Sequence, residues 1–330
     1  MKITALEEHL MTPAIVEAWK TAPDEARDQY ATFNSRGVLG ERLLDVGLRR
    51  ISDMDDQGID VQVLSVTTPG VQNLSAKEAV PLAREANDAI AAAVRAHPDR
   101  FEGFATLPTP DPEAAAAELR RAVTELGFMG AMVHGRTGSK NADDAIHEPV
   151  WRAASELRAP IYLHPQMPVI PVRDAYYADL DPFASFALGG PGIGWHYEAG
   201  IQAIRMILGG VFDRNPGLQV VLGHWGEVVL FYTERIEKLQ DWANLGLKKP
   251  ILEYFKENLS FTGSGDLSDR YLAWTKDVVG TDRILYATDY PFIDTDKGRA
   301  RAFLESADLT EAEKSAVGAR NWERLTAHLR

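Results

Sequence analysis

Short apolar runs alternate with longer helical stretches along nearly the whole chain, and this alternation restricts the folds open to it. Eight runs have the length and apolar content of strands: residues 3–6, 61–66, 104–107, 131–133, 161–163, 220–222, 259–262 and 284–287. Several are too continuously apolar for a sheet with one face in water. They suit parallel strands that are buried on both faces.

Helix signals lie between these runs. Ser75 and Glu78 form a capping-box pattern, and Asp111 followed by Pro112 reads as an N-cap with proline at the first helical position. Further helices are predicted over residues 226–239, 297–305 and 310–329. Eight strands alternating with helices predict one (β/α)₈ TIM barrel over residues 1–330, with a doubly wound open sheet as the alternative.

Two long segments interrupt the rhythm. Residues 18–46 are polar, and residues 166–197 are rich in proline, glycine and aromatic side chains. Long connections on a barrel usually cover the active site, so we expect lid loops at the C-terminal face. The glycines at positions 189–194 do not fit the G-x-G-x-x-G pattern of nucleotide sites, and a flexible lid is the favoured interpretation.

Composition excludes several classes of protein. A net charge of −13 without a basic cluster argues against nucleic acid as a partner. The absence of cysteine excludes disulfides, iron–sulfur clusters, thiolate zinc sites and cysteine nucleophiles. No apolar run approaches the ~18 residues of a membrane span, and no signal peptide is evident. We therefore expect a cytoplasmic protein without a membrane segment.

Residues that bind metals follow several of the predicted strands. In barrel enzymes the catalytic residues stand at the C-terminal ends of strands. Three of the eight histidines have this position, namely His9, His164 and His224, and Asp289 follows the last strand. Glu7 and His9 are two residues apart, so on a strand both side chains point the same way, as expected if they share a cation.

Each of these signals also has an ordinary explanation. Residues 7–9 taken alone are consistent with a solvated strand end, His164 with a hydrogen-bonded core histidine, and Asp289 with a helix N-cap. An aspartate after a buried strand is nevertheless costly to desolvate unless it is paired or bound to metal. Because separate strand ends all supply ligand-type residues, their combination predicts a metal site.

Glu227 follows His224 by three positions at a strand-to-helix junction, where one turn brings the two side chains together. A carboxylate bonded to an imidazole fixes its tautomer and raises its basicity. The alternative role of Glu227 is helix capping.

Three further residues are candidates for contact with a substrate. His134 follows the fourth strand and should also face the mouth of the barrel. Trp195 and His196 lie in the predicted lid, where His196 has either a substrate contact or an ordinary place in the lid.

Short motifs spread over the chain resemble those of a known family. They are Ala5-Leu6-Glu7-Glu8-His9, Pro98-Asp99-Arg100-Phe101, Phe104-Ala105-Thr106-Leu107, Tyr162-Leu163-His164-Pro165, Gly209-Gly210-Val211-Phe212-Asp213, Leu222-Gly223-His224-Trp225-Gly226-Glu227, Asp282-Arg283-Ile284-Leu285 and Thr288-Asp289-Tyr290-Pro291-Phe292. The combination resembles the amidohydrolase superfamily. It is most similar to the branch of metal-dependent aromatic-acid decarboxylases, which includes the γ-resorcylate, 2,3-dihydroxybenzoate and 5-carboxyvanillate enzymes. Aminocarboxymuconate-semialdehyde decarboxylase is more distant.

The resemblance implies one divalent ion, Zn²⁺ or Mn²⁺, without an organic cofactor, and its ligands would be Glu7, His9, His164 and Asp289. His224 and Glu227 would lie beside the ion. Arg235 matches an arginine that reaches the substrate carboxylate of a neighbouring subunit, which implies a homodimer or homotetramer. His134 stands where the γ-resorcylate enzyme has asparagine, and residues 166–197 differ from that enzyme, so the particular aromatic acid stays open.

The function predicted from these residues is non-oxidative decarboxylation of a hydroxylated aromatic acid. Asp289 would protonate the ring carbon that bears the carboxylate, and His224, oriented by Glu227, would bond a substrate oxygen or hold a water. The main alternative is hydrolysis or hydration of a lactone, amide or enol acid, with Asp289 as general base toward metal-activated water. A non-catalytic binding or scaffold protein is the third possibility.

Overall fold

The parallel strands of the chain form one ring. The structure, a computed structural model, describes residues 1–23, 28–293 and 297–330. Part of the predicted 18–46 segment, residues 24–27, lies outside the described residues. The strands are β1 (Thr4–Leu10), β2 (Val61–Val66), β3 (Phe101–Gly103), β4 (Ala105–Thr106), β5 (Ala131–His134), β6 (Ile161–His164), β7 (Val220–Leu222) and β8 (Leu259–Phe261).

The ring closes at two places, the junction between β3 and β4 and the segment of residues 284–286. β3 pairs with β2 and β4 pairs with β5, while only Phe104 separates β3 from β4. Residues 284–286 bridge the remaining gap, because Ile284 pairs with Phe261 of β8 and Tyr286 pairs with Ala5 of β1, both in parallel. The predicted (β/α)₈ barrel is confirmed, and the open-sheet alternative is wrong. The eighth predicted strand is present as these two bridges.

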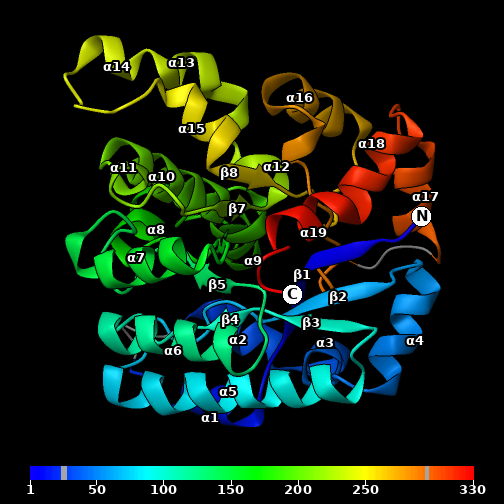
Figure 1. The fold of residues 1–330 in the computed structure, drawn as a ribbon. Coiled ribbons are helices and arrows are strands. Elements are labelled where there is room, and N and C mark those ends of the chain that lie inside the picture. Colours follow the sequence, from blue (N-terminus) through cyan, green and yellow to red (C-terminus); the bar gives the residue numbers. More distant parts are fainter. Residues whose placement is uncertain (24–27, 294–296) are drawn as a thin grey trace.

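Helices surround the ring (Figure 1). None of the helices in the described ranges combines the length and apolar content that crossing a membrane requires. Their bounds are α1 (Pro13–Thr21), α2 (Gln29–Asn34), α3 (Gly37–Leu44), α4 (Leu48–Gln57), α5 (Ala76–Ala96), α6 (Pro112–Thr124), η1 (Ala145–His147), α7 (Glu148–Leu157), α8 (Ile170–Tyr176), α9 (Pro182–Ala187), η2 (Leu188–Gly192), α10 (Gly194–Leu208), α11 (Val211–Arg214), α12 (His224–Glu227), η3 (Val229–Tyr232), α13 (Thr233–Glu237), α14 (Leu239–Trp242), α15 (Ile251–Glu257), α16 (Asp269–Val279), η4 (Thr281–Arg283), α17 (Arg299–Ser306), α18 (Glu311–Ser315), η5 (Ala316–Arg320) and α19 (Asn321–Leu325).

The helix starts predicted at Ser75 and Asp111 are confirmed, but two predicted helices are not continuous. Ser75 caps α5 through the capping box, and Asp111 caps α6. The segment predicted as one helix over residues 226–239 is divided into short pieces, because the chain turns through left-handed conformations from His224 to Val228. The segment predicted over residues 310–329 is likewise divided, into α18, η5 and α19.

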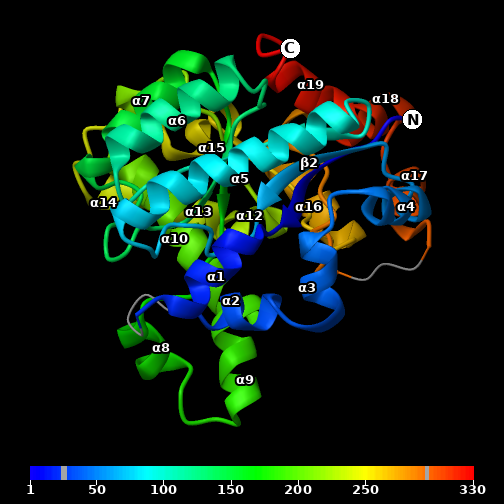
Figure 2. The ribbon, with the colours of Figure 1, turned by 90° about the horizontal axis from the view of Figure 1, so that it is seen from below.

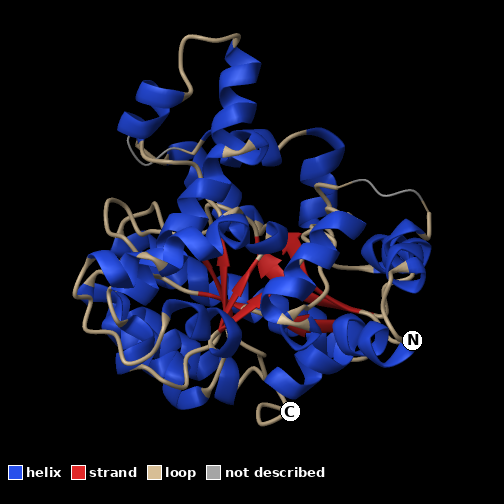
Figure 3. Cartoon of the chain, turned by 90° about the horizontal axis from the view of Figure 1, so that it is seen from above, coloured by secondary structure: helices blue, strands red, loops and turns tan. Residues whose placement is uncertain are grey.

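The two long interruptions are helical rather than loops, which corrects the prediction of lid loops. The first contains the end of α1 together with α2 and α3, and the second contains α8, α9 and the start of α10. Figures 2 and 3 show α8 and α9 projecting on one side of the barrel, the side toward which the strand arrows point. The lid is therefore a set of short helices over the C-terminal face.

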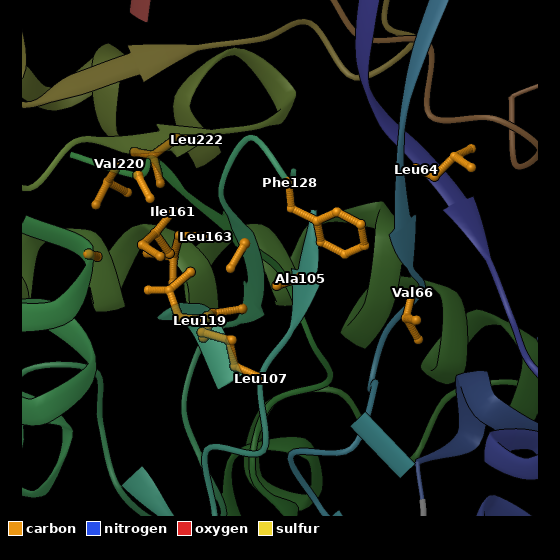
Figure 4. Close-up of a cluster of buried hydrophobic side chains, with 14 of the residues drawn as sticks. Leu64, Val66, Ala105, Leu107, Leu119, Phe128, Ile161, Leu163, Val220 and Leu222 are labelled. Atoms are coloured by element: carbon orange, nitrogen blue, oxygen red, sulfur yellow. The ribbon is translucent and has the colours of Figure 1, made fainter. Parts of the chain in front are cut away.

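Apolar side chains fill the barrel on both sides of the strands. Tyr162 of β6 points into the ring and joins an inner cluster of nine buried residues, whereas its neighbours Ile161 and Leu163 point outward. Figure 4 shows the outward set between the strands and the surrounding helices. Burial on both faces agrees with the continuous apolar runs in the sequence.

Asn87 of α5 stabilises the break between β3 and β4 through side-chain hydrogen bonds. Its Oδ1 accepts from the backbone N–H of Thr106 at 2.7 Å, and its Nδ2 donates to the carbonyl of Thr106 at 3.0 Å and to Glu118 Oε1 at 2.7 Å. All three contacts are buried, so the amide side chain replaces part of the sheet ladder at this break.

We predict that Asn87→Ala lowers the free energy of unfolding by about 2–4 kcal/mol, since each buried polar group left without a partner costs roughly 1–3 kcal/mol. Urea denaturation followed by circular dichroism measures the change. Glu85→Ala on the exposed face of the same helix is the control and should stay within about 0.5 kcal/mol of wild type. Equal stability of the two variants would contradict the role of Asn87.

Candidate metal centre

A bulge in β1 turns one acidic side chain, Glu7, and one basic side chain, His9, toward the same point inside the barrel mouth. Ala5 pairs with Gln62 and Glu8 with Leu64, so two residues of β1 lie opposite one residue of β2. Glu7 and His9 consequently face the same region, with 3.9 Å between Glu7 Oε1 and His9 Nε2. The prediction that they share one side is confirmed.

His164 at the end of β6 completes a group of three metal-binding side chains. Its Nε2 lies 3.0 Å from Glu7 Oε1, and its Nδ1 donates to the carbonyl of Pro165 at 2.7 Å. That hydrogen bond leaves Nε2 free to act as a ligand. One ligand atom from each of Glu7, His9 and His164 lies within 4.8 Å of the other two.

The other oxygen of Glu7 is held by hydroxyl groups. Tyr162 donates to Glu7 Oε2 at 2.5 Å, and Ser264 donates to the same oxygen. In contrast, Glu7 Oε1 and His9 Nε2 are buried without a hydrogen-bond partner in the described part of the chain. Buried polar atoms without partners are costly, and a cation between them would remove that cost. The donor set of one carboxylate and two imidazoles therefore fits a divalent transition metal.

Asp289 stands next to this group. Its Oδ1 lies 3.4 Å from His9 Nε2, and its backbone has a positive φ of 58°. The preceding residue, Thr288, is fixed by Glu8, whose Oε1 accepts from the backbone N–H at 2.9 Å and whose Oε2 accepts from the hydroxyl at 2.6 Å. β1 thus supplies two ligand-type side chains and also positions the fourth through Glu8.

One buried carboxylate is shared by two histidines. Glu227 Oε1 lies 2.7 Å from His224 Nδ1, and Glu227 Oε2 lies 2.8 Å from His196 Nδ1. The two rings are 4.5 Å apart, and His224 Nε2 lies 4.0 Å from Glu7 Oε1. The predicted pairing of Glu227 with His224 is confirmed. The sharing with His196, which ties α10 of the lid to this carboxylate, has no signal in the sequence.

Burial and neighbouring charges shift the pKa values of these groups in different directions. Burial alone would raise the pKa of Glu7, but the positive charge of His224 and the neighbouring rings of His164 and His9 hold it well below its usual range. Burial and the negative charge of Glu7 raise the pKa of Asp289 well above its usual value. Burial lowers the pKa of His224, but the negative charges of Glu227 and Glu7 outweigh this effect and raise it to about 10. These shifts favour an ionised Glu7, a cationic His224 and a protonated Asp289.

The turn that carries His224 is strained. His224, Trp225, Glu227 and Val228 all have φ between 46° and 62°. Each non-glycine residue in this conformation costs roughly 1–2 kcal/mol. Hydrogen bonds from His224 N to Ser264 Oγ at 2.9 Å and from Trp225 N to the carbonyl of Thr262 at 2.8 Å hold the turn in place. Strain that persists in this way is typical of functional sites.

Exposure shows on which side the centre is open. The side chains of Glu7 and His9 are fully buried, whereas those of Asp289, His196 and His224 keep 12%, 15% and 16% of their surface exposed. A ligand would therefore approach past Asp289 and the two histidines, and not through the barrel floor.

The remaining predicted contacts divide into two groups. His134 is buried at the mouth, with its Nδ1 3.3 Å from His164 Nδ1. Trp195 lies 6.2 Å from the His164 ring and packs on Tyr30 of α2 at 4.7 Å, so both lid segments meet over the centre. Arg235 is not brought to this site; it is exposed on α13, with its guanidinium 5.4 Å from the Trp242 ring.

Three side chains at the centre were missed in the sequence. Tyr162 stands two residues before His164 on the same strand face, a spacing that could have indicated it. Ser264 follows β8 closely, and its place after a strand was a weaker signal. Tyr30 reaches the site only through the folding of the first lid segment, for which no local pattern exists.

The fold and this site define a metal-dependent barrel enzyme of one family. The amidohydrolase family model matches residues 45–325, and the chain belongs to that family. A γ-resorcylate decarboxylase from Rhodococcus jostii (strain RHA1) is 35% identical over 331 residues, covering 96% of each protein.

Solved structures agree with this assignment. 5-Carboxyvanillate decarboxylase from Sphingomonas paucimobilis superimposes with a TM-score of 0.90 at 31% identity, covering 99% of both chains. A dihydroxybenzoic acid decarboxylase from Polaromonas sp. JS666, with bound manganese and the inhibitor 2-nitroresorcinol, has a TM-score of 0.86 at 34% identity. The match covers all of this chain and 98% of that one. The aromatic-acid decarboxylase resemblance seen in the sequence is confirmed.

We predict that Tyr162→Phe weakens Mn²⁺ or Zn²⁺ affinity by about 10–100-fold, because hydrogen bonds to a ligating carboxylate orient it. Competition with a fluorescent chelator measures the dissociation constant. The matched control is Tyr254→Phe on α15, which removes a hydroxyl group that donates to Asp213 at 2.5 Å. This variant should bind metal as wild type does. Unchanged affinity in Tyr162→Phe would disprove the orienting role.

Proposed function

We propose that this chain, as a single-domain enzyme, catalyses metal-dependent, non-oxidative decarboxylation of a hydroxylated aromatic carboxylic acid. One observation carries the proposal. The carboxyl group of Asp289 lies 3.4 Å from His9, within a buried group whose unpaired atoms call for a cation, and its surroundings raise its pKa. The decarboxylases named above, with inhibitor and manganese bound in one of them, support this reaction class.

The residues proposed to hold the ion are Glu7, His9, His164 and Asp289. Bound there, Mn²⁺ or Zn²⁺ would supply Lewis-acid chemistry and a fixed point for anionic substrate oxygens. Glu7 contributes most of the negative charge at this point, and the hydroxyl groups of Tyr162 and Ser264 keep its free oxygen directed at the histidines.

Asp289 is the proposed proton donor. Its carboxyl proton passes to the ring carbon that bears the substrate carboxylate, which breaks the aromatic sextet. The bond from that carbon to the carboxylate then cleaves, its electron pair returns to the ring, and CO₂ leaves. The Asp289 carboxylate regains a proton from water. A raised pKa suits this role, because it favours the protonated carboxyl that a proton donor needs.

His224 is proposed to bond the substrate anion beside the metal. Glu227 keeps its Nδ1–H engaged, so that Nε2 faces the centre and the cationic ring attracts a carboxylate. His134 and Trp195 would border the aromatic ring, and His196 would hold the lid to Glu227.

The test is incubation of Mn²⁺- or Zn²⁺-loaded protein with a panel of hydroxybenzoates, following CO₂ release and loss of the acid. We expect turnover of at least one ortho-hydroxylated acid and none after metal removal by a chelator. Turnover of lactones or amides without any CO₂ release would instead establish the hydrolytic alternative.

We predict that Asp289→Asn lowers kcat by about 10²–10⁴, since proton transfer by a placed acid contributes that much. The side chain keeps its shape and loses its proton. Metal content of the variant, measured by mass spectrometry, separates loss of the donor from loss of the ion. Asp269→Asn on the surface of α16 is the control and should keep wild-type activity. Full activity in Asp289→Asn would refute the assignment.

We also propose that the enzyme is a homodimer or homotetramer in which Arg235 serves a neighbouring site. Aromatic side chains are exposed around it, with Phe231, Trp242 and Trp274 showing 65%, 60% and 46% of their surface. Phe231 stacks on Trp274 at 5.2 Å. Exposed aromatic groups with an arginine are typical of protein interfaces, and this face lies outside the metal centre of its own chain.

Mixing two inactive variants tests the shared site. Arg235→Ala and Asp289→Asn should each be inactive alone. Subunits exchanged between them should recover up to about a quarter of wild-type activity, because half of the dimers are mixed and each has one intact site. Sedimentation of the wild-type protein as a monomer, or no recovery after verified exchange, would contradict the proposal.

A further inference from the structure

A polar cavity lies at the opposite end of the barrel from the metal centre. It has a volume of about 670 Å³ and is bordered by Gln219 just before β7, Ser260 of β8, and Arg283 just before the bridging segment. Part of its wall is α19, which Figure 2 shows on the side away from α8 and α9. It is therefore open at the N-terminal ends of the strands.

Positive side chains gather around this cavity. Its cationic members are Arg158, Lys256, Arg283 and Arg324, joined by His328. Only two carboxylates line it, Glu257 and Asp282. The formal charge of the lining is thus +2 with histidine neutral, from four cations and two carboxylates, in a chain whose net charge is −13.

The two carboxylates compensate only part of this positive charge. Glu257 pairs with Lys249, which does not line the cavity, at 2.6 Å, and Asp282 pairs with Arg324 at 3.7 Å. Within residues 1–23, 28–293 and 297–330, neither Arg158 nor Lys256 has a carboxylate within ion-pair distance. The cavity therefore holds positive charge that the described chain leaves uncompensated.

Arg283 is positioned at this cavity by neutral acceptors. Its Nη1 donates to Gln219 Oε1 at 3.1 Å, and its Nη2 donates to the carbonyl of Glu257 at 2.8 Å. Burial and the nearby charge of Arg324 lower the pKa of Arg283, against the opposing effect of Glu257 and Asp282. An anion bound beside this guanidinium would offset the cost of its burial.

We propose that this cavity is a binding site for a small phosphate-bearing anion, separate from the metal centre. Guanidinium and ammonium groups match phosphate oxygens in charge and geometry, and a concave wall focuses their field. Its volume lies within the range of roughly 300–1,000 Å³ that is usual for small-molecule sites. Inorganic phosphate is the minimal occupant, and the space admits a phosphorylated metabolite.

Isothermal titration of the metal-loaded protein with inorganic phosphate, at low and at physiological salt, tests the site. We expect saturable binding of one phosphate per chain. The double variant Arg158→Asn/Lys256→Gln should weaken it by about tenfold or more, because two charge-assisted contacts are lost. Both residues are exposed, and asparagine tolerates the positive φ of 51° at position 158, so the fold should persist.

Two controls make the result specific. Lys77→Gln/Arg84→Gln removes the same charge from the exposed face of α5, away from the cavity, and should bind phosphate as wild type does. Glu7→Gln impairs the metal centre and should also leave phosphate binding unchanged, whatever reaction that centre catalyses. The proposal is overturned if wild type shows no saturable binding, if the α5 variant is weakened equally, or if Glu7→Gln abolishes binding.

Discussion

A fully buried carboxylate, that of Glu7, is the constraint on which the mouth of the barrel depends. A charge in this position is costly unless its surroundings compensate for it. Two hydroxyl groups hold one oxygen. His9 and His164 face the other, with His164 Nε2 3.0 Å away, and that oxygen has no hydrogen-bond partner in the described part of the chain. The β1 bulge serves this arrangement, because it directs Glu7 and His9 inward while Glu8 fixes the strand beside Asp289.

A second buried carboxylate organises the other half of the site. Glu227 binds His224 and His196 at the same time, and the first of these rings faces the metal centre while the second belongs to the lid. The left-handed turn is the conformation that brings Glu227 back toward His224 three residues earlier. Its strain is therefore the cost of placing a carboxylate and an imidazole from one short segment in contact.

The barrel and the metal-binding group could largely be predicted because both depend on local patterns. The β2 and β7 bounds agree with the apolar runs to the residue, and His164 ends β6 as predicted. Glu7 and His9 do not follow the first strand as predicted but lie within it, because β1 continues to Leu10. The errors lie where packing overrides local preference. Residues 226–239 have helical composition, but the turn at the site divides them, and the lid segments fold into helices by docking on one another.

The sequence by itself determined that strands and helices alternate eight times and that ligand-type residues end several strands, since periodicity and strand-end position are properties of neighbouring residues. Only the tertiary structure decided which of these residues meet. Ring closure brings Ser264 and Tyr162 to Glu7 from positions 257 and 155 residues away. The bulge sets the register of β1, and lid docking joins His196 to Glu227. These contacts arise from long-range packing, which no local pattern encodes.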